Sequence, residues 1–242
     1  MQWRDEAIVL GGRKFGESGL ILDVLTATRG RQSGLVYGGA SRRKRGQYEP
    51  GTSLSVEWNG RLEGQLGRFN TAEATRERAA RLLDSVDALA ALAAITALLR
   101  GVLDEGDSEG SSIFKPTLTL LDCLEQPDVW PAIYARWEFG LLSALGFGLD
   151  VETCAVSGAN DGLTHVSPKT GRAVRGSEAD EYVDRLLALP AFLIEPGQSL
   201  APGDITSSLI LTGHFLDQRV FAAVDKPLPD ARMRLLNRLN GR

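Results

Sequence analysis

The feature that most constrains the fold of this chain is a change of hydrophobic period near residue 71. Before it, short apolar runs alternate with glycine-rich turns, and Thr52–Trp58 alternates apolar and polar side chains strictly. After it, Leu and Ala recur at helical spacing, first over Ala72–Leu103. A period of two followed by one near 3.6 predicts a small β domain and then a helical domain.

Five short strands are predicted within residues 1–70. They are Trp3–Leu10, Leu20–Thr26, Gln32–Tyr37, Thr52–Trp58 and Leu62–Phe69. Gly11–Ser18 is expected to be a turn, and Asn59–Gly60 is a strong hairpin signal. This pattern favours a five-stranded OB-fold β-barrel. An SH3-like barrel would give a similar pattern, and periodicity does not separate the two.

The rest of the chain is predicted to be mainly helical. The expected helices are Ala72–Leu103, Ile113–Leu124, Trp130–Leu145, Ser177–Leu187, Thr206–Val224 and Asp230–Leu239. Asp150–Gly176 has few large apolar residues, so it predicts an insert of turns and one short hairpin. The expected division of this multi-domain α+β protein is an OB-fold at 1–70, a first helical part at 71–149, the insert at 150–176 and a C-terminal helical part at 177–242.

Charge is distributed unevenly along the chain. The net charge of −4 does not suggest a nucleic-acid binder, but residues 1–70 hold 11 Lys and Arg against 7 Asp and Glu, whereas the remainder holds 16 against 24. A basic module joined to an acidic body points to nucleic-acid contact at one end. The sequence has no apolar run long enough to span a membrane and no secretory signal, and its two cysteines are not a disulfide framework. These features predict a cytoplasmic protein.

The cations of the first domain fall in its predicted turns and loops, with four in succession from Arg42 to Arg45. Loops of a small barrel can converge on one rim, where cations neutralise a phosphate backbone. The candidate DNA-binding residues are therefore Arg13, Lys14, Arg29, Arg31, Arg42, Arg43, Lys44 and Arg45. Phe15 and Tyr48 could stack on bases or could be core or lid residues of the barrel. Binding is expected to be salt-sensitive and to show little sequence preference.

No set of residues in the sequence predicts catalysis. The chain has no phosphate-binding G-x-x-x-x-G-K-[ST] loop and no G-x-G-x-x-G after a strand. His214 lies in an apolar helical segment, which is typical of a core or half-buried histidine. His165 and Cys154 would supply only part of a metal site, since structural zinc takes four ligands. We expect a protein that is not an enzyme, with no catalytic residue.

At this point the whole chain resembles the RecO family of bacterial recombination-mediator and DNA-annealing proteins. The resemblance rests on the order and spacing of several motifs, each weak alone. They are Ile8–Leu10, Phe15–Thr26, Gly30, Gly38–Arg43, Tyr48–Gly51, Arg136–Asp150 running into Cys154, and Lys226–Pro229 followed by the Arg-rich helix Arg232–Leu239.

The resemblance implies an N-terminal OB-fold, a helical body and, in many members, an inserted zinc module with four cysteines. This sequence departs from that pattern. Cys154 occupies the first ligand position, but Ser157 stands at the second, and no cysteine follows. We therefore predict no zinc and no other cofactor, and an insert held by hydrogen bonds and packing.

The resemblance also implies non-enzymatic work in DNA repair. Family members bind single- and double-stranded DNA, anneal complementary strands coated with single-stranded-DNA-binding protein, and act with RecR to load RecA, which makes RecA an indirect partner. It implies a cytoplasmic, nucleoid-associated location. The rival hypothesis is an OB-fold protein that binds RNA or the ribosome and has no repair role.

The resemblance further implies that the helical body binds the acidic, apolar-ended tail of the single-strand-binding protein. Such a tail needs a cation for its carboxylates beside an apolar pocket. Arg136 and Trp137 are the candidate residues for that contact. Arg136 could instead form an ordinary surface ion pair with Glu138 or with another neighbour.

Overall fold

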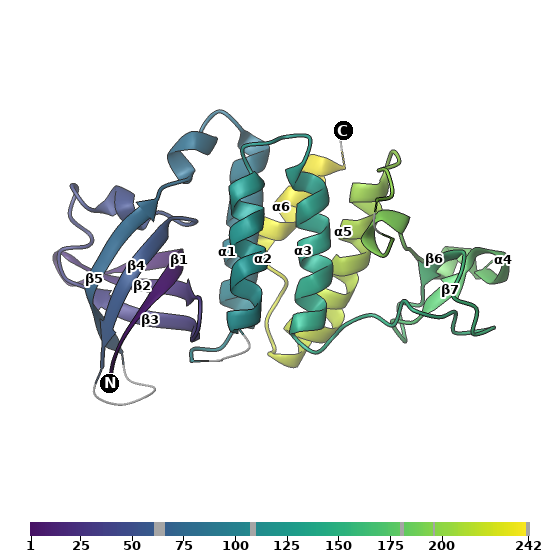
Figure 1. Ribbon diagram of the computed structural model, residues 1–242, viewed down its shortest axis with the longest axis horizontal. Helices are drawn as coiled ribbons and strands as arrows, with labels where there is room; N and C mark the ends of the chain where they lie inside the picture. The colour runs from purple at the N-terminus through teal and green to yellow at the C-terminus, as the bar shows by residue number, and fades with distance from the viewer. Residues whose placement is uncertain (61–65, 107–109, 180–181, 196, 241–242) are drawn as a thin grey trace. The chain divides into compact units, whose positions relative to one another are not determined.

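The computed structural model describes residues 1–60, 66–106, 110–179, 182–195 and 197–240. It divides the chain into two compact units, Met1–Pro127 with Pro229–Arg232, and Asp128–Leu228 with Met233–Arg242. The first unit contains a β-barrel and two long helices, and the second contains further helices and a small sheet (Figure 1).

The barrel consists of five strands in the closed order β1-β2-β3-β5-β4. They are β1 (Gln2–Phe15), β2 (Gly19–Thr26), β3 (Gly30–Val36), β4 (Ser53–Asn59) and β5 (Gly67–Arg76). Neighbours pair antiparallel except β3 and β5, which pair in parallel through Gly34 with Gly67 and Leu35 with Arg68. This topology is that of an OB-fold, and it settles the choice that periodicity left open.

Strand β1 is longer than predicted, because Gly11–Phe15 continue it and do not form a turn. Residues Gln2–Ile8 pair with β4, and Ala7–Phe15 pair with β2, with a shift of register between Val9 and Gly11. A bulge bends a strand and increases its twist. Strand β1 can therefore pair with β4 along its first half and with β2 along its second half, which closes the barrel. The turn that follows is confined to Gly16–Ser18.

Strand β5 also extends beyond the predicted boundary at residue 70. Residues Thr71–Arg76 pair with β4, so the helix predicted over Ala72–Leu103 starts only at Val86, after a 3-10 turn over Ala79–Leu82. Arg68 pairs with Asn59, so Asn59–Gly60 does not form a two-residue hairpin, and residues 61–65 of that connection lie outside the described residues.

Two aromatic rings require glycine where the barrel closes. A Cβ on Gly34 would lie 2.7 Å from the Phe69 ring, and one on Gly67 would lie 2.1 Å from the Trp58 ring. Trp58 also stacks on Trp3 with ring centroids 5.4 Å apart. These rings fill the barrel interior together with Val9, Leu22, Val24, Val36, Tyr48, Leu54 and Val56.

Helices α1 (Val86–Val102) and α2 (Gly110–Cys123) complete the first unit. Ser85 caps α1 by accepting a hydrogen bond from the Ala88 N–H. The Ala- and Leu-rich faces of α1 are buried. Helix α2 begins before Ile113, so Pro116 lies inside it and not in its first turn. Its contacts with β2 and β3 place it on the outer face of the barrel.

The second unit combines helices with a three-stranded sheet. Its long elements are α3 (Trp130–Ala144), α5 (Asp204–Phe215), a π-helical turn at Leu216–Phe221 and α6 (Asp230–Leu239), whose first residues belong to the first unit. The sheet has the order β7-β6-β8 and contains β6 (Leu163–Val166), β7 (Ala173–Arg175) and β8 (Leu187–Ala188).

The predicted hairpin of the insert is confirmed by β6 and β7. The predicted helix Ser177–Leu187 is wrong. Of the residues that the structure describes in this span, Gly176–Ala179 form α4, Val183–Arg185 form a 3-10 turn, and Leu187 joins β8.

Candidate nucleic-acid interface

The β1–β2 turn and the basic loop, defined as Ser41–Arg45, lie at the same end of the barrel. The Ala40 N–H donates to the Ser18 carbonyl at 3.0 Å, and the Gly39 backbone packs against Leu20 and Val36. Arg13 and Lys14 are exposed on the last residues of β1, which lead into this turn. We call the cations gathered here the basic end, and they are Arg13, Lys14, Arg42, Arg43, Lys44 and Arg45.

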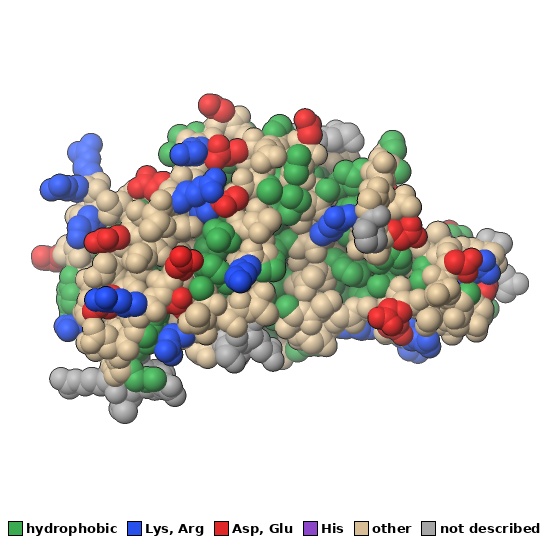
Figure 2. All heavy atoms as spheres, in the orientation of Figure 1, with side chains coloured by type: hydrophobic (Ala, Val, Ile, Leu, Met, Phe, Trp, Pro, Cys, Tyr) green, Lys and Arg blue, Asp and Glu red, His purple; other side chains and the backbone are tan. Residues whose placement is uncertain are grey.

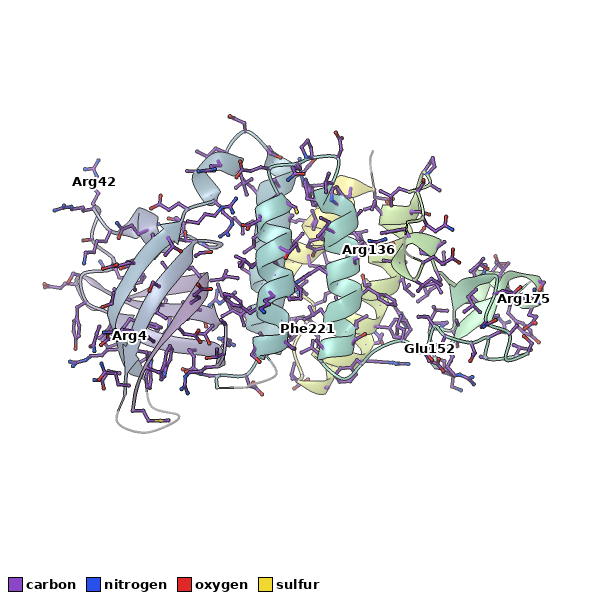
Figure 3. The ribbon with its side chains drawn as sticks, in the orientation of Figure 1. Arg4, Arg42, Arg136, Glu152, Arg175 and Phe221 are labelled. Carbon is purple, nitrogen blue, oxygen red and sulfur yellow. The ribbon has the colours of Figure 1, made fainter. Side chains whose placement is uncertain are left out.

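The basic loop is ordered by its own backbone. The Ser41 carbonyl accepts hydrogen bonds from the Lys44 N–H at 3.0 Å and the Arg45 N–H at 2.9 Å, and a 3-10 turn follows at Arg45–Tyr48. All four cationic side chains are exposed, and no ion pair joins them to an acid among the described residues. Lys and Arg side chains stand out from the barrel, and Arg42 projects away from it (Figures 2 and 3).

The β2–β3 turn lies at the opposite end of β2, so the predicted loops do not converge on one rim. Strand β2 separates the two ends by roughly 25 Å, at about 3.3 Å per residue. At this far end Thr28 donates through its N–H and its hydroxyl to Asp5, and the Arg29 guanidinium lies 5.4 Å from the centroid of Trp3. Arg29 is exposed but does not belong to the basic end.

The Arg31 side chain is held by hydrogen bonds within the protein. Its guanidinium binds both carboxylate oxygens of Asp23, at 2.8 and 3.0 Å, and also donates to the Arg100 and Leu103 carbonyls at 2.9 and 2.8 Å. Asp23 accepts a further hydrogen bond from Arg100 at 3.0 Å, so this group ties β2 and β3 to α1. Four of the five N–H donors of Arg31 are therefore engaged within the protein, and its predicted DNA contact is not supported.

Replacing Arg31 with Gln is expected to lower the free energy of unfolding by about 2 kcal/mol, because the mostly buried Asp23 loses its two-pronged partner. DNA affinity and its salt dependence should not change. Urea unfolding and fluorescence anisotropy measure the two effects. Arg13→Gln is the matched comparison. It should leave the free energy of unfolding unchanged and reduce the magnitude of the slope of log K against log salt by about one. A fall in that slope for Arg31→Gln would contradict the assignment.

The two aromatic residues considered for stacking have different environments. Tyr48 is buried in the barrel core and donates its hydroxyl to the Ala72 carbonyl at 3.2 Å, and burial raises its pKa. Stacking by Tyr48 is therefore wrong. Phe15 is 50% exposed, and its stacking stays a prediction.

Sequence reasoning missed two exposed residues beside the basic end, Tyr37 and Arg68. The sequence pattern places Tyr37 at the end of a predicted strand and Arg68 within another, and neither position by itself indicates a binding role. The signal that could have found Tyr37 is the alternation along β3, which buries Gly34 and Val36 and so turns Tyr37 outward.

The candidate pair for the acidic tail is not a surface pair. Trp137 is buried and packs beside Tyr134 with ring centroids 5.8 Å apart, so it cannot offer an apolar surface. Arg136 is exposed, but it donates twice to the Phe192 carbonyl, at 3.0 and 2.7 Å. The alternative ion pair of Arg136 with Glu138 is also wrong, because Glu138 is buried and accepts from the hydroxyls of Tyr134 and Thr212. Arg136 is labelled in Figure 3.

Hydrogen bonds hold the insert at the position of the absent zinc ligands. The buried Cys154 thiol donates to Glu178 at 2.9 Å, and its sulfur accepts from the N–H groups of Val156 and Arg175. The hydrogen bonds from Cys154 and Ser157 lower the pKa of Glu178. Among the described residues no group of three His, Cys, Asp or Glu side chains is placed to hold a metal ion. The absence of zinc remains a prediction.

Comparison with known proteins decides the family. The family model for the N-terminal part of recombination protein O matches residues 1–78, and the model for its C-terminal part matches residues 83–226. The chain is 65% identical to the DNA repair protein RecO of Hyphomonas neptunium over 99% of this chain and 98% of that protein. It is 44% identical to RecO of Caulobacter vibrioides and 43% to RecO of Phenylobacterium zucineum, over 99% of this chain and 98% of each relative.

This chain belongs to the RecO family. It is thus a DNA repair protein and a non-enzymatic recombination mediator. The N-terminal match ends two residues after β5, which agrees with a barrel that extends past residue 70. None of the helices in the described part of this RecO protein has the length and apolar character needed to cross a membrane.

Proposed function

We propose that this chain binds single- and double-stranded DNA through the basic end of its barrel and anneals complementary strands coated with single-stranded-DNA-binding protein. The observation that carries the proposal is the basic end itself. It places the exposed cations of β1 and the basic loop side by side, with no carboxylate partner for the loop cations among the described residues.

Annealing requires no bond chemistry. Two strands repel each other through their phosphates, and cations that neutralise both strands lower this repulsion. Base pairing then supplies the free energy. The reaction fits a protein in which the sequence offers no catalytic constellation and the exposed cations are the functional groups.

The proposal includes protein partners and a location. RecO of this kind acts with RecR to load RecA and takes the acidic tail of the single-strand-binding protein, in the cytoplasm at the nucleoid. The negative balance of residues 71–242 supports a separation of roles, with DNA on the barrel and proteins elsewhere. With Trp137 buried, Arg136 is left as the exposed half of the tail-binding candidate.

The test is an annealing assay on complementary strands coated beforehand with the cognate single-strand-binding protein. This chain should accelerate duplex formation, and a binding protein that lacks its acidic tail should reduce the acceleration. Equal annealing with and without the chain would contradict the proposal. Tighter binding to RNA than to DNA of equal length, without annealing, would favour the RNA-binding alternative.

A further inference from the structure

Tyr37 is an exposed aromatic side chain at the point where β3 leads into the basic loop. Its exposed fraction is 68%, whereas the preceding Val36 is 5% exposed and faces the core. Alternation along the strand therefore puts Tyr37 on the same outer face as Leu35. The Tyr37 ring is therefore not part of the barrel core.

Cations flank this outer face. The strand registers form a continuous row across four strands, because Arg13 pairs with Ile21, Ile21 with Leu35, and Leu35 with Arg68. Directly opposed residues project from the same face of a sheet. The row therefore carries an exposed cation at each end and two aliphatic side chains between them, of which Ile21 is buried and Leu35 is partly exposed.

The next row toward the basic end carries the aromatic residues. Phe15 lies opposite Gly19 on β2, and Tyr37 follows Val36, which lies opposite Leu20. Phe15 and Tyr37 are thus two strands apart, a spacing of about 10 Å at 4.8 Å per strand. Gly19 between them has no side chain to separate the two rings.

Two hollows meet at Tyr37 and Arg68. The first has a volume of about 730 Å³ and is lined by Tyr37, Lys44, Gln47, Arg68 and Asn70 among others. The second, of about 360 Å³, is lined by Leu35, Tyr37 and Arg68 among others. Tyr37 and Arg68 therefore form the boundary that both hollows share. Glu73 and Glu77 also line the first hollow, and their carboxylates would repel phosphates there.

We propose that Tyr37 stacks on an unpaired base while Arg68 and Lys44 neutralise the flanking phosphates, which gives the barrel a preference for single strands. This inference rests on the proposed function, because it assigns a second role beside the basic end. A single strand offers exposed base faces to an aromatic ring, at any sequence. In a duplex the bases are stacked on one another, so Tyr37 adds nothing there. The carboxylates of Glu73 and Glu77 mark where the strand turns away.

The experiment compares the intact wild-type chain with Tyr37→Ala, Tyr37→Phe and Tyr182→Ala. Tyr182 is the matched control because it is an exposed tyrosine, 54% exposed, in the other compact unit. Fluorescence anisotropy measures the affinity for a labelled single strand and for a duplex of the same length over a series of salt concentrations. Circular dichroism checks that each variant is folded.

Tyr37→Ala should weaken single-strand binding by about tenfold or more, with an unchanged slope against log salt and unchanged duplex affinity. Tyr37→Phe and Tyr182→Ala should bind as the wild type does. Arg68→Ala should instead reduce the magnitude of the slope of log K against log salt for the single strand by about 0.7, the value for one phosphate contact. Unchanged single-strand affinity in Tyr37→Ala, or an equal loss for both DNAs, would overturn the inference alone. A wild-type chain that binds neither DNA would overturn the proposed function, and the inference with it.

Discussion

Replacing Arg42, Arg43, Lys44 and Arg45 together with alanine is expected to weaken DNA binding by about 100-fold near 0.1 M salt. The slope of log K against log salt on duplex DNA is negative, and each phosphate contact contributes about 0.9 to its magnitude. The loss of four contacts therefore reduces the magnitude of that slope by up to about 3.6. The four side chains are exposed and are not in ion pairs among the described residues, so their removal should not alter folding.

Anisotropy titrations over a salt series measure both the affinity and the slope. The charge-conserving variant Arg42→Lys, Arg43→Lys and Arg45→Lys is the control, and it should retain most of the slope because each contact depends mainly on net charge. The affinities of wild type and quadruple variant should approach each other at high salt. An unchanged slope in the quadruple variant would show that the basic loop is a solvated charge cluster and not the DNA surface.

The second large effect is expected from Arg78→Ala, which should lower the free energy of unfolding by about 3 kcal/mol. The Arg78 side chain is 2% exposed. It donates to the Gly51 carbonyl at 2.7 Å, to the Ser53 hydroxyl at 2.9 Å and twice to Asp122. Its removal leaves a buried carbonyl without this donor and weakens the link between β4 and α2. Asp122 is 36% exposed, which places the expected cost at the low end for a broken buried pair.

Urea unfolding measures this change, and hydrogen exchange should locate it in β4 and α2. Arg81→Ala is the matched control, because Arg81 is 61% exposed and lies 3.7 Å from Glu125, so its loss should cost less than about 0.5 kcal/mol. Arg78→Lys should recover only part of the stability, since an ammonium cannot reach Asp122, Gly51 and Ser53 as a planar fork does. Equal stability of Arg78→Ala and Arg81→Ala would contradict the role of Arg78 as the link between β4 and α2.

The errors in the predicted elements share a physical cause. Glycine and polar residues favour turns in isolation, so the sequence predicts a turn over Gly11–Ser18, whereas pairing with β2 keeps Gly11–Phe15 in the strand. Thr71–Arg76 have helix-prone neighbours, yet pairing with β4 keeps them in β5. In both cases contacts between residues distant in sequence outweigh local preference.

The same limit applied to the candidate site. The sequence alone determined a small β domain followed by a mainly helical chain, an excess of cations in the first 70 residues, and a basic loop, because these depend on periodicity and on residue type. Only the tertiary structure decided where each cation lies and which partners it has. Arg31 meets Asp23 and the end of α1, Arg29 lies at the far end of β2, and Arg13 joins Arg42–Arg45 because Ser18 and Ala40 are hydrogen-bonded. The reason is that a cation becomes structural or available through neighbours that the fold brings to it, and sequence spacing does not contain that information.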